Sequence, residues 1–418
     1  MSKGDRFILF RIMPKQKLPR QFWIIATIAF INSVSFTIII PLLYPYAKQF
    51  NLSDLQASLL TTAYALAQFL GTPILGKLSD RMGRKPILIV SLIGTVLSNV
   101  LASISNTALL LYLARIFDGL TGANNSVASA VISDITTPEQ RPQAFGIFAA
   151  IFRLGFVVGP ALSYVAQQLP TLPGVSSLGM SFVVAAIIAL IAVFLTLFLL
   201  PETAPQTRTQ DFNLSWEDFT FSQIAKSATK PRLGKLFILT FLSGTSFTIF
   251  TFAFQPFFLN ILNRNSQELA IAFSVVGMLG FISQVFALEP LQKRFNLIDI
   301  LAMALLIRGV TFFLMPTFPT ITAFAIILAV FSSVNAFPMP LIQSILSLNS
   351  TQKEQGEILG INASYLSIAN AIGPFISGLL VSMGYKMPLW LTGCLTAAIA
   401  WFALSLKSEF RCEKADIA

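Results

Sequence analysis

The sequence predicts an all-helical integral membrane protein whose transmembrane helices form two related halves. Three observations lead to this prediction. Of the 418 residues, 55% are hydrophobic and only 11% are charged, whereas a water-soluble domain carries about 25% charged residues. Apolar runs of about 20 residues, the length that crosses the hydrocarbon core as a helix, recur twelve times along the chain. Finally, the stretch around residue 146 recurs around residue 360.

The twelve apolar runs divide evenly around one long polar stretch. They lie at 22–46, 54–75, 87–106, 108–133, 143–166, 179–200, 235–260, 268–289, 298–316, 319–346, 355–383 and 385–407. Because they lack the two-residue alternation of membrane strands, a β-barrel is excluded. We therefore expect an N-terminal arm (1–21), a first half (22–200), a central linker (201–234), a second half (235–407) and a tail (408–418).

Basic residues predict that both termini are cytoplasmic. Most of the 28 Lys and Arg residues fall in the arm, the linker, the tail and the connections on that side. The opposite side holds Lys48, Arg264 and Lys386. Cytoplasmic loops of membrane proteins carry this excess, so topology explains the net charge of +10. No folded basic domain for nucleic acid is expected. We expect a multi-pass protein of a bacterial inner membrane, in contact with lipid.

The amino-acid inventory argues against an enzyme. The chain has no His and only two Cys, so the usual metal-ligand sets and the Cys/His or Ser/His nucleophile pairs are missing. We therefore expect no metal and no cofactor.

An internal repeat relates the two halves. A shift of 214 residues aligns six positions without a gap: Thr137 with Thr351, Gly146 with Gly360, Ala149 with Ala363, Gly159 with Gly373, Pro160 with Pro374 and Ser163 with Ser377. Repeated halves in transporters enclose a pathway whose sites lie near the middle of the membrane.

The string GKLSDRMGRKP at 76–86 is the most specific motif. It resembles the signature of the major facilitator superfamily, and the resemblance extends over all twelve runs. It implies the major facilitator fold, a small-molecule substrate, alternating access and a monomer. Gly76 and Gly83 allow tight turns, and Asp80 can pair with Arg81, Arg84 or a helix N-terminus. We expect these residues to form a cytoplasmic latch that favours the outward-open state.

The fifth run contains Gly155, Gly159 and Pro160. This pattern resembles the motif of drug and metabolite antiporters, which implies export. Ser163 and Tyr164 replace the glycine pair that closes the family motif, so we expect looser packing there. Pro160 bends the helix, either as part of the transport mechanism or for packing alone.

The fourth run carries Arg115 and Asp118, three residues apart and hence on one helical face. Ionised groups at membrane depth pair with one another or line water. The run resembles the helix-four motif of proton-coupled antiporters, which implies a role of Arg115 in proton handling. Asp118 is our candidate proton carrier; a permanent ion pair is the alternative.

Within the superfamily the chain is most similar to tetracycline-efflux pumps of the drug:proton antiporter group. The strings DGLTGA at 118–123 and DITTPEQR at 134–141 carry this resemblance. The family's essential carboxylates in helices one, three and nine are replaced by Asn32, by Ser98 and by Ile307 with Arg308. Tetracycline is therefore not the expected cargo.

Arg115, Arg153 and Arg308 outnumber Asp118 at membrane depth. We hypothesise that Arg153 and Arg308 attract an anionic cargo; contact with lipid phosphates is the alternative. Polar residues on apolar helices either bind cargo or join helices. The substrate-binding candidates besides the two arginines are Asn32, Tyr64, Gln68, Asn335, Asn362 and Tyr365.

These observations predict a secondary transporter that exports a small amphipathic molecule, drug-like or secreted, such as a carboxylate siderophore. Proton antiport is the expected energy source. An uptake carrier or uniporter for an organic anion is the alternative, and a sensor or scaffold without transport is a third interpretation. In the linker, Ser215 either begins a surface helix or belongs to a tether.

Overall fold

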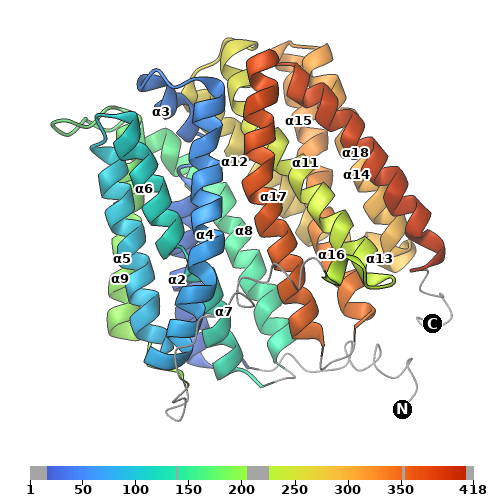
Figure 1. Cartoon of the computed structure of the whole chain (residues 1–418), viewed down its shortest axis with the longest axis horizontal. Helices are drawn as coiled ribbons and strands as arrows, with labels where there is room; N and C mark the ends of the chain where they lie inside the picture. Colours follow the sequence, from blue (N-terminus) through green and yellow to red (C-terminus); the bar gives the residue numbers. More distant parts are fainter. Residues whose placement is uncertain (1–16, 138–139, 205–225, 351–353, 411–418) are drawn as a thin grey trace.

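The structure is a computed structural model that describes residues 17–137, 140–204, 226–350 and 354–410. Within these ranges every regular element is a helix, and ten helices are long and apolar enough to cross a membrane. The helices stand side by side in one bundle (Figure 1), with α2 beginning and α18 ending at the same end. We call this end the inner end, because the basic residues predict that it is cytoplasmic, and the opposite end the outer end.

The bounds of the helices follow the apolar runs closely. In the first half they are α2 (Arg20–Thr37), α3 (Leu43–Gln49), α4 (Asp54–Met82), α5 (Arg84–Ser103), α6 (Ala108–Thr121), α7 (Asn124–Ile135), α8 (Arg141–Ala166) and α9 (Gly179–Leu199). In the second half they are α11 (Leu233–Asn260), α12 (Ser266–Phe286), α13 (Leu288–Arg294), α14 (Leu297–Thr317), α15 (Ile321–Asn335), α16 (Pro338–Leu348), α17 (Gln355–Met383) and α18 (Met387–Ser405), followed by the 3₁₀ turn η2 (Leu406–Ser408). The helix start expected at Ser215 lies outside the described residues.

The first, fourth and tenth runs are not single helices. The fourth is divided at Gly122, whose backbone leaves the helical conformation, and the tenth is divided before Pro338. Proline lacks an N–H and its ring clashes with the preceding turn, so α15 cannot continue through it. The breaks at Gly122 and Ala336 lie 214 residues apart, the same shift that relates α8 to α17. The two halves are therefore interrupted at equivalent points.

Helix α4 corrects one expectation. It begins at a capping box in which Ser53 and Gln56 satisfy each other's backbone N–H groups. It then continues to Met82, well beyond the expected end at residue 75. Gly76 therefore lies inside a helix and forms no turn. Only Gly83, with a φ of +103°, separates α4 from α5, and a positive φ favours glycine.

Within each half, a threonine-bearing helix packs closely on a glycine-bearing helix. Thr37 on α2 donates a hydrogen bond to the carbonyl oxygen of Gly155 on α8 at 2.7 Å, and Thr248 on α11 donates to that of Ala369 on α17 at 3.0 Å. A Cβ atom at Gly159 would lie 2.1 Å from Thr37 Oγ1. The antiporter-motif glycines thus create the close contact of α2 with α8.

The halves meet through α4 against α17 and α8 against α12 (Figure 1). Hydrogen bonds between the halves lie in the outer part of the bundle: Tyr44 N to Gln255 Oε1 (3.4 Å), Thr62 Oγ1 to Ala371 O (3.0 Å) and Ser266 Oγ to Gln167 Oε1 (2.7 Å). Toward the inner end, by contrast, a Cβ atom at Gly76, Gly146 or Gly360 would find no atom within 4 Å. The described contacts therefore hold the halves together mainly at the outer end.

Candidate functional site

The candidate coupling pair lies inside the first half, on α6. Arg115 Nη1 donates to Asp118 Oδ2 at 2.8 Å, as the three-residue spacing predicts. Each residue is only 5% exposed. Because a buried charge is costly without a partner, each side chain of this pair stabilises the charge of the other.

Tyr64 and Gln68 on α4 connect this pair to the break in the fourth run. The guanidinium carbon of Arg115 lies 4.4 Å from the centre of the Tyr64 ring, a cation–π contact. Gln68 Nε2 donates to the Tyr64 hydroxyl at 3.0 Å and to the carbonyl oxygen of Gly122 at 2.9 Å. These contacts connect the ion pair to the point where α6 ends.

Polar groups of α2, α5 and α7 complete this cluster. Asn124, at the start of α7, donates to Asn32 Oδ1 at 3.1 Å and to Thr95 Oγ1 at 3.2 Å. Its own Oδ1 is buried without a partner. The hydroxyls of Thr95 and Ser98 face the carboxylate of Asp118. The residues that stand at two of the expected acid positions, Asn32 and Ser98, therefore belong to the surroundings of the remaining acid.

In the second half, Arg308 on α14 points into the bundle and is 2% exposed. Its Nη2 donates to the carbonyl oxygen and the hydroxyl of Ser243 on α11, at 3.1 and 3.0 Å. Its Nη1 donates to Asn335 Oδ1 at the end of α15, at 3.5 Å. Burial excludes lipid-phosphate contact by Arg308 in this conformation. The structure thus brings together Arg308 and Asn335, two of the predicted substrate-binding residues.

The other predicted substrate-binding residues are more dispersed. Asn362 accepts a hydrogen bond from Thr240 at 2.6 Å. Tyr365 lies 3.2 Å from Ser227 through its hydroxyl and stacks on Phe237. These contacts join α17 to neighbouring segments of its own half.

Arg153 is half-buried on α8 and forms no ion pair with a carboxylate of the described ranges. It lies one turn from Phe156, whose backbone touches Gly277 of α12 across the interface between the halves. Ser163, farther along α8, is fully buried and lies 3.5 Å from Ser181 on α9. Arg153 therefore lies close to the interface with the second half, on a different helix from the ion pair of Arg115 and Asp118.

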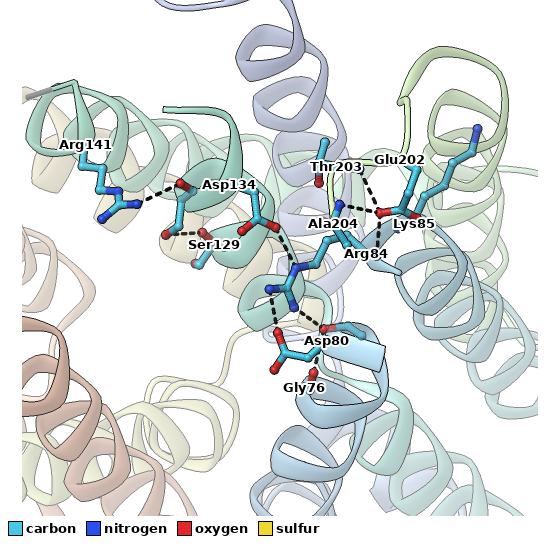
Figure 2. Close-up of polar contacts among 12 residues, drawn as sticks. Gly76, Asp80, Arg84, Lys85, Ser129, Asp134, Arg141, Glu202, Thr203 and Ala204 are labelled. Atoms are coloured by element: carbon cyan, nitrogen blue, oxygen red, sulfur yellow. Dashed lines mark hydrogen bonds and ion pairs between the residues drawn. The ribbon is translucent and has the colours of Figure 1, made fainter. Parts of the chain in front are cut away.

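The latch is centred on Arg84 (Figure 2). Its Nη2 lies 2.7 Å from Asp80 on α4 and its Nε lies 2.9 Å from Asp134 on α7. Arg84 is 5% exposed, whereas Arg81 is exposed on the surface of α4. Of the two expected arginine partners of Asp80, the structure pairs it with Arg84. These ion pairs tie together the inner ends of three helices of the first half.

Glu202 is a latch residue that sequence reasoning missed. It follows α9 and accepts hydrogen bonds from the backbone N–H groups of Arg84 (2.8 Å) and Lys85 (3.1 Å), at the start of α5. A carboxylate at a helix N-terminus is favoured by the unsatisfied N–H groups there. Burial raises the pKa of Glu202, but backbone donors from Ala204, Arg84, Thr203 and Lys85 outweigh this and hold the pKa below its usual range.

Asp134 lies in the string at 134–141, and Glu202 lies at the start of the expected linker at 201–234. What the sequence lacked was their partner, because Arg84 lies 50 residues from the first and 118 from the second. Across the described residues, no group of three or more His, Cys, Asp or Glu side chains is placed to hold a metal ion.

The fold and the site define a polytopic membrane transporter with two related halves and an ion pair buried in one of them. A comparison with protein-family models agrees with this class: residues 25–230 and 236–412 match the model described as Major Facilitator Superfamily. The chain belongs to this family. Its members are transporters and not enzymes, so the expectations of the family, of the fold and of a non-enzymatic protein are confirmed.

The chain is similar to several drug-resistance proteins. The chain is 26% identical over 383 residues to the tetracycline resistance protein, class B, of Escherichia coli, covering 87% of this chain and 88% of the relative. It is also 26% identical over 388 residues to multidrug resistance protein 1 of Bacillus subtilis (strain 168), covering 91% and 96%. The chain is thus related to drug-efflux pumps, which implies secondary active transport.

Solved structures share the fold at low sequence identity. A bacterial homolog of the human lysosomal transporter Spinster, in an inward-facing and unoccupied conformation, superposes with a TM-score of 0.78 at 16% identity, covering 93% of this chain and 97% of that one. The human organic anion transporter MFSD10 (TETRAN) gives a TM-score of 0.70 at 19% identity, covering 92% and 100%.

Proposed function

We propose that this protein exports a small amphipathic molecule in exchange for protons by alternating access. The observation that carries the proposal is the buried pair of Arg115 and Asp118, with 2.8 Å between its charged atoms. An ionised pair at membrane depth is expensive and is retained chiefly at ion pathways and coupling sites. The relation to drug-efflux proteins supports the direction of transport.

A proton that reaches Asp118 from outside neutralises the carboxylate. Arg115 then keeps its charge but loses the partner that oriented it, so its contact with the Tyr64 ring must carry more of the stabilisation. Gln68 links Tyr64 to the break at Gly122. Protonation in this mechanism shifts the balance between two arrangements of α4 and α6, and loss of the proton inside restores the ion pair.

The conformation fits one stage of this cycle. Hydrogen bonds between the halves lie in the outer part of the bundle, and the ion pairs of Arg84 with Asp80 and with Asp134 lie within the first half. We assign this arrangement to the inward-facing state, with both termini cytoplasmic in a bacterial inner membrane. In the outward-open state the latch residues Gly76, Asp80, Arg81, Gly83 and Arg84 would approach the second half.

The cargo we propose is drug-like or a secreted metabolite, with a carboxylate siderophore as one example. Tyr64, Gln68 and Asn32 lie in the cluster around the proton site, so cargo and proton can affect the same side chains. Arg153 and Arg308 add positive charge, and neither forms an ion pair with a carboxylate in the described part of the chain. Charge-assisted hydrogen bonds to an anionic group would use this charge.

Proteoliposomes loaded with a pH-sensitive dye test the coupling. Ethidium and fluorescein serve as cationic and anionic probes, and vesicles without protein are the control. We expect an imposed pH gradient to drive one or both probes opposite to the proton and to speed proton entry into the vesicles. Probe movement that ignores the gradient in both directions would contradict antiport.

An organic-anion uptake carrier or uniporter is the second candidate. It is favoured by Arg153 and Arg308, which form no ion pair with a described carboxylate, and by the fold shared with the human organic anion transporter MFSD10. The same vesicles separate the two proposals, because a uniporter would equilibrate fluorescein without moving protons.

A further inference from the structure

Arg308 is a cation buried at the middle of a helix, and no ion pair joins it to a carboxylate whose side chain the structure describes. The residue is 2% exposed, and its Nε atom has no hydrogen-bond partner among the described residues. Its hydrogen-bond acceptors among the described residues, Ser243 and Asn335, are neutral. Burying an unpaired charge costs several kcal/mol, which neutral acceptors offset only in part.

Four carboxylates of the second half whose side chains the structure describes lie near helix ends, away from the middle of α14. Glu268, Glu289 and Asp299 lie in first turns, and Glu289 and Asp299 pair with lysines at the inner end. Glu409 follows the last helix and pairs with Lys235. The charge of Arg308 is therefore left for something other than these side chains to balance.

The internal repeat shows that the second half lacks an acid at the position equivalent to Asp118, although the two arginines are not themselves equivalent, because the same shift relates Arg308 to Gly94. Asp118 on α6 corresponds, by the 214-residue shift, to Ser332 on α15. Ser332 is 1% exposed and donates to the carbonyl oxygen of Leu328 at 2.6 Å. The first half therefore supplies a carboxylate to its buried arginine, whereas the second half has a hydroxyl at the equivalent place, one turn from Asn335.

We propose that Arg308 is the centre of an anion site between α11, α14 and α15, which takes a monovalent anion. Two sources share this chemistry: chloride from solution, or the carboxylate of an anionic cargo. The bond from Nη1 to Asn335, at 3.5 Å, is the longest that Arg308 makes, and an anion would replace it with a charge-assisted bond of about 2.8 Å. The second source rests on the proposed transport function; the first does not.

The two halves therefore differ in the kind of ion that they attract. The first half holds a cation and an acid of its own and can bind a proton, whereas the second half holds a cation alone and attracts a negative charge. Of the two arginines expected to bind anions, the structure favours Arg308, because Arg153 is only half-buried and can be solvated.

Thermal unfolding of the purified, detergent-solubilised protein tests the site without any transport. Chloride, acetate and benzoate are titrated against gluconate at constant ionic strength. We expect the midpoint of unfolding to rise in a saturable way with at least one of these anions, since a ligand that binds only the folded state stabilises it. In Arg308→Gln we expect the apparent affinity for that anion to fall roughly tenfold or more.

Two further variants serve as controls. Arg264→Gln removes a positive charge at the outer end, where Arg264 faces Glu268 at 3.4 Å, and should leave the anion response intact. Arg308→Lys keeps the charge and should keep part of the response, which preserves the test if Arg308→Gln does not fold. Wild-type protein that responds to no anion, or an undiminished response in Arg308→Gln, would overturn the proposal.

The identity of the effective anion separates the two sources. Protection by chloride that benzoate does not reproduce assigns the site to a halide. Protection by benzoate that chloride weakens assigns it to a cargo carboxylate. Because no pH gradient is used, the anion site and proton antiport can each fail while the other stands.

Discussion

Replacement of Gly159 by alanine should loosen the contact between α2 and α8. An added Cβ atom would lie 2.1 Å from Thr37 Oγ1 and 2.8 Å from the backbone nitrogen of Ile38, whereas 3.4 Å is an ordinary contact. The Thr37 side chain can rotate away, but this breaks its hydrogen bond to Gly155. The backbone of α2 must move as well.

The expected cost has two parts. Overpacking of a tight contact costs about 1–3 kcal/mol, and the lost hydrogen bond adds about 0.5–1.5 kcal/mol. We therefore expect Gly159→Ala to lower the free energy of unfolding by about 1.5–4.5 kcal/mol. Gly146→Ala, on the same helix, is the matched control: its Cβ atom would find nothing within 4 Å, so stability should stay within about 1 kcal/mol of wild type.

Unfolding in mixed micelles of increasing SDS content, followed by tryptophan fluorescence, measures both variants. Thr37→Ala in the Gly159→Ala background should recover only part of the loss, because the α2 backbone remains too close. Equal unfolding free energies for Gly159→Ala and Gly146→Ala would refute the assigned packing.

Three further predictions concern the latch and the coupling pair. Arg84→Gln leaves two carboxylates without their cation and should cost about 3 kcal/mol of unfolding free energy, whereas Arg81→Gln at an exposed position should cost less than about 1 kcal/mol; equal losses would contradict the assignment of Arg84 as the centre. Glu202 has a lowered pKa, so its stabilisation is present above the ordinary pKa and fades as pH falls through the lower folded value; Glu202→Gln should flatten the acid side of the stability–pH profile, and an unchanged profile would argue against the cap. Tyr64→Phe keeps the ring against Arg115 and should retain gradient-driven probe flux, whereas Tyr64→Leu should lower it about tenfold; equal flux in both would remove the ring from the mechanism.

The sequence predicts most of the fold because the membrane imposes simple requirements. Apolar length gives the helices, and the repeat gives the two halves. The break before Pro338 could have been predicted from the proline itself. It was missed because the apolar run continues through this position. The extension of α4 to Met82 was missed because charged residues end a hydropathy run without ending a helix.

The site was predictable where its residues are close in sequence. The pair of Arg115 and Asp118 follows from a three-residue spacing on one helix. Contacts between distant elements depend on how the helices pack, and no spacing encodes them. The link from Gln68 to Gly122, and that from Arg308 to Ser243, are of this kind.

Gradient-driven flux in Asp118→Asn is the most direct test of the account. The variant is compared with wild type and with Asp299→Asn, which alters a carboxylate paired with Lys407 at the inner end. Ethidium or fluorescein is used, whichever probe responds to the gradient in wild type, and each protein is also assayed for probe exchange without a gradient. We predict that Asp118→Asn retains exchange but loses the response to the pH gradient, while Asp299→Asn keeps both. A wild-type response to the gradient in Asp118→Asn would contradict the assignment of Asp118 as the proton carrier.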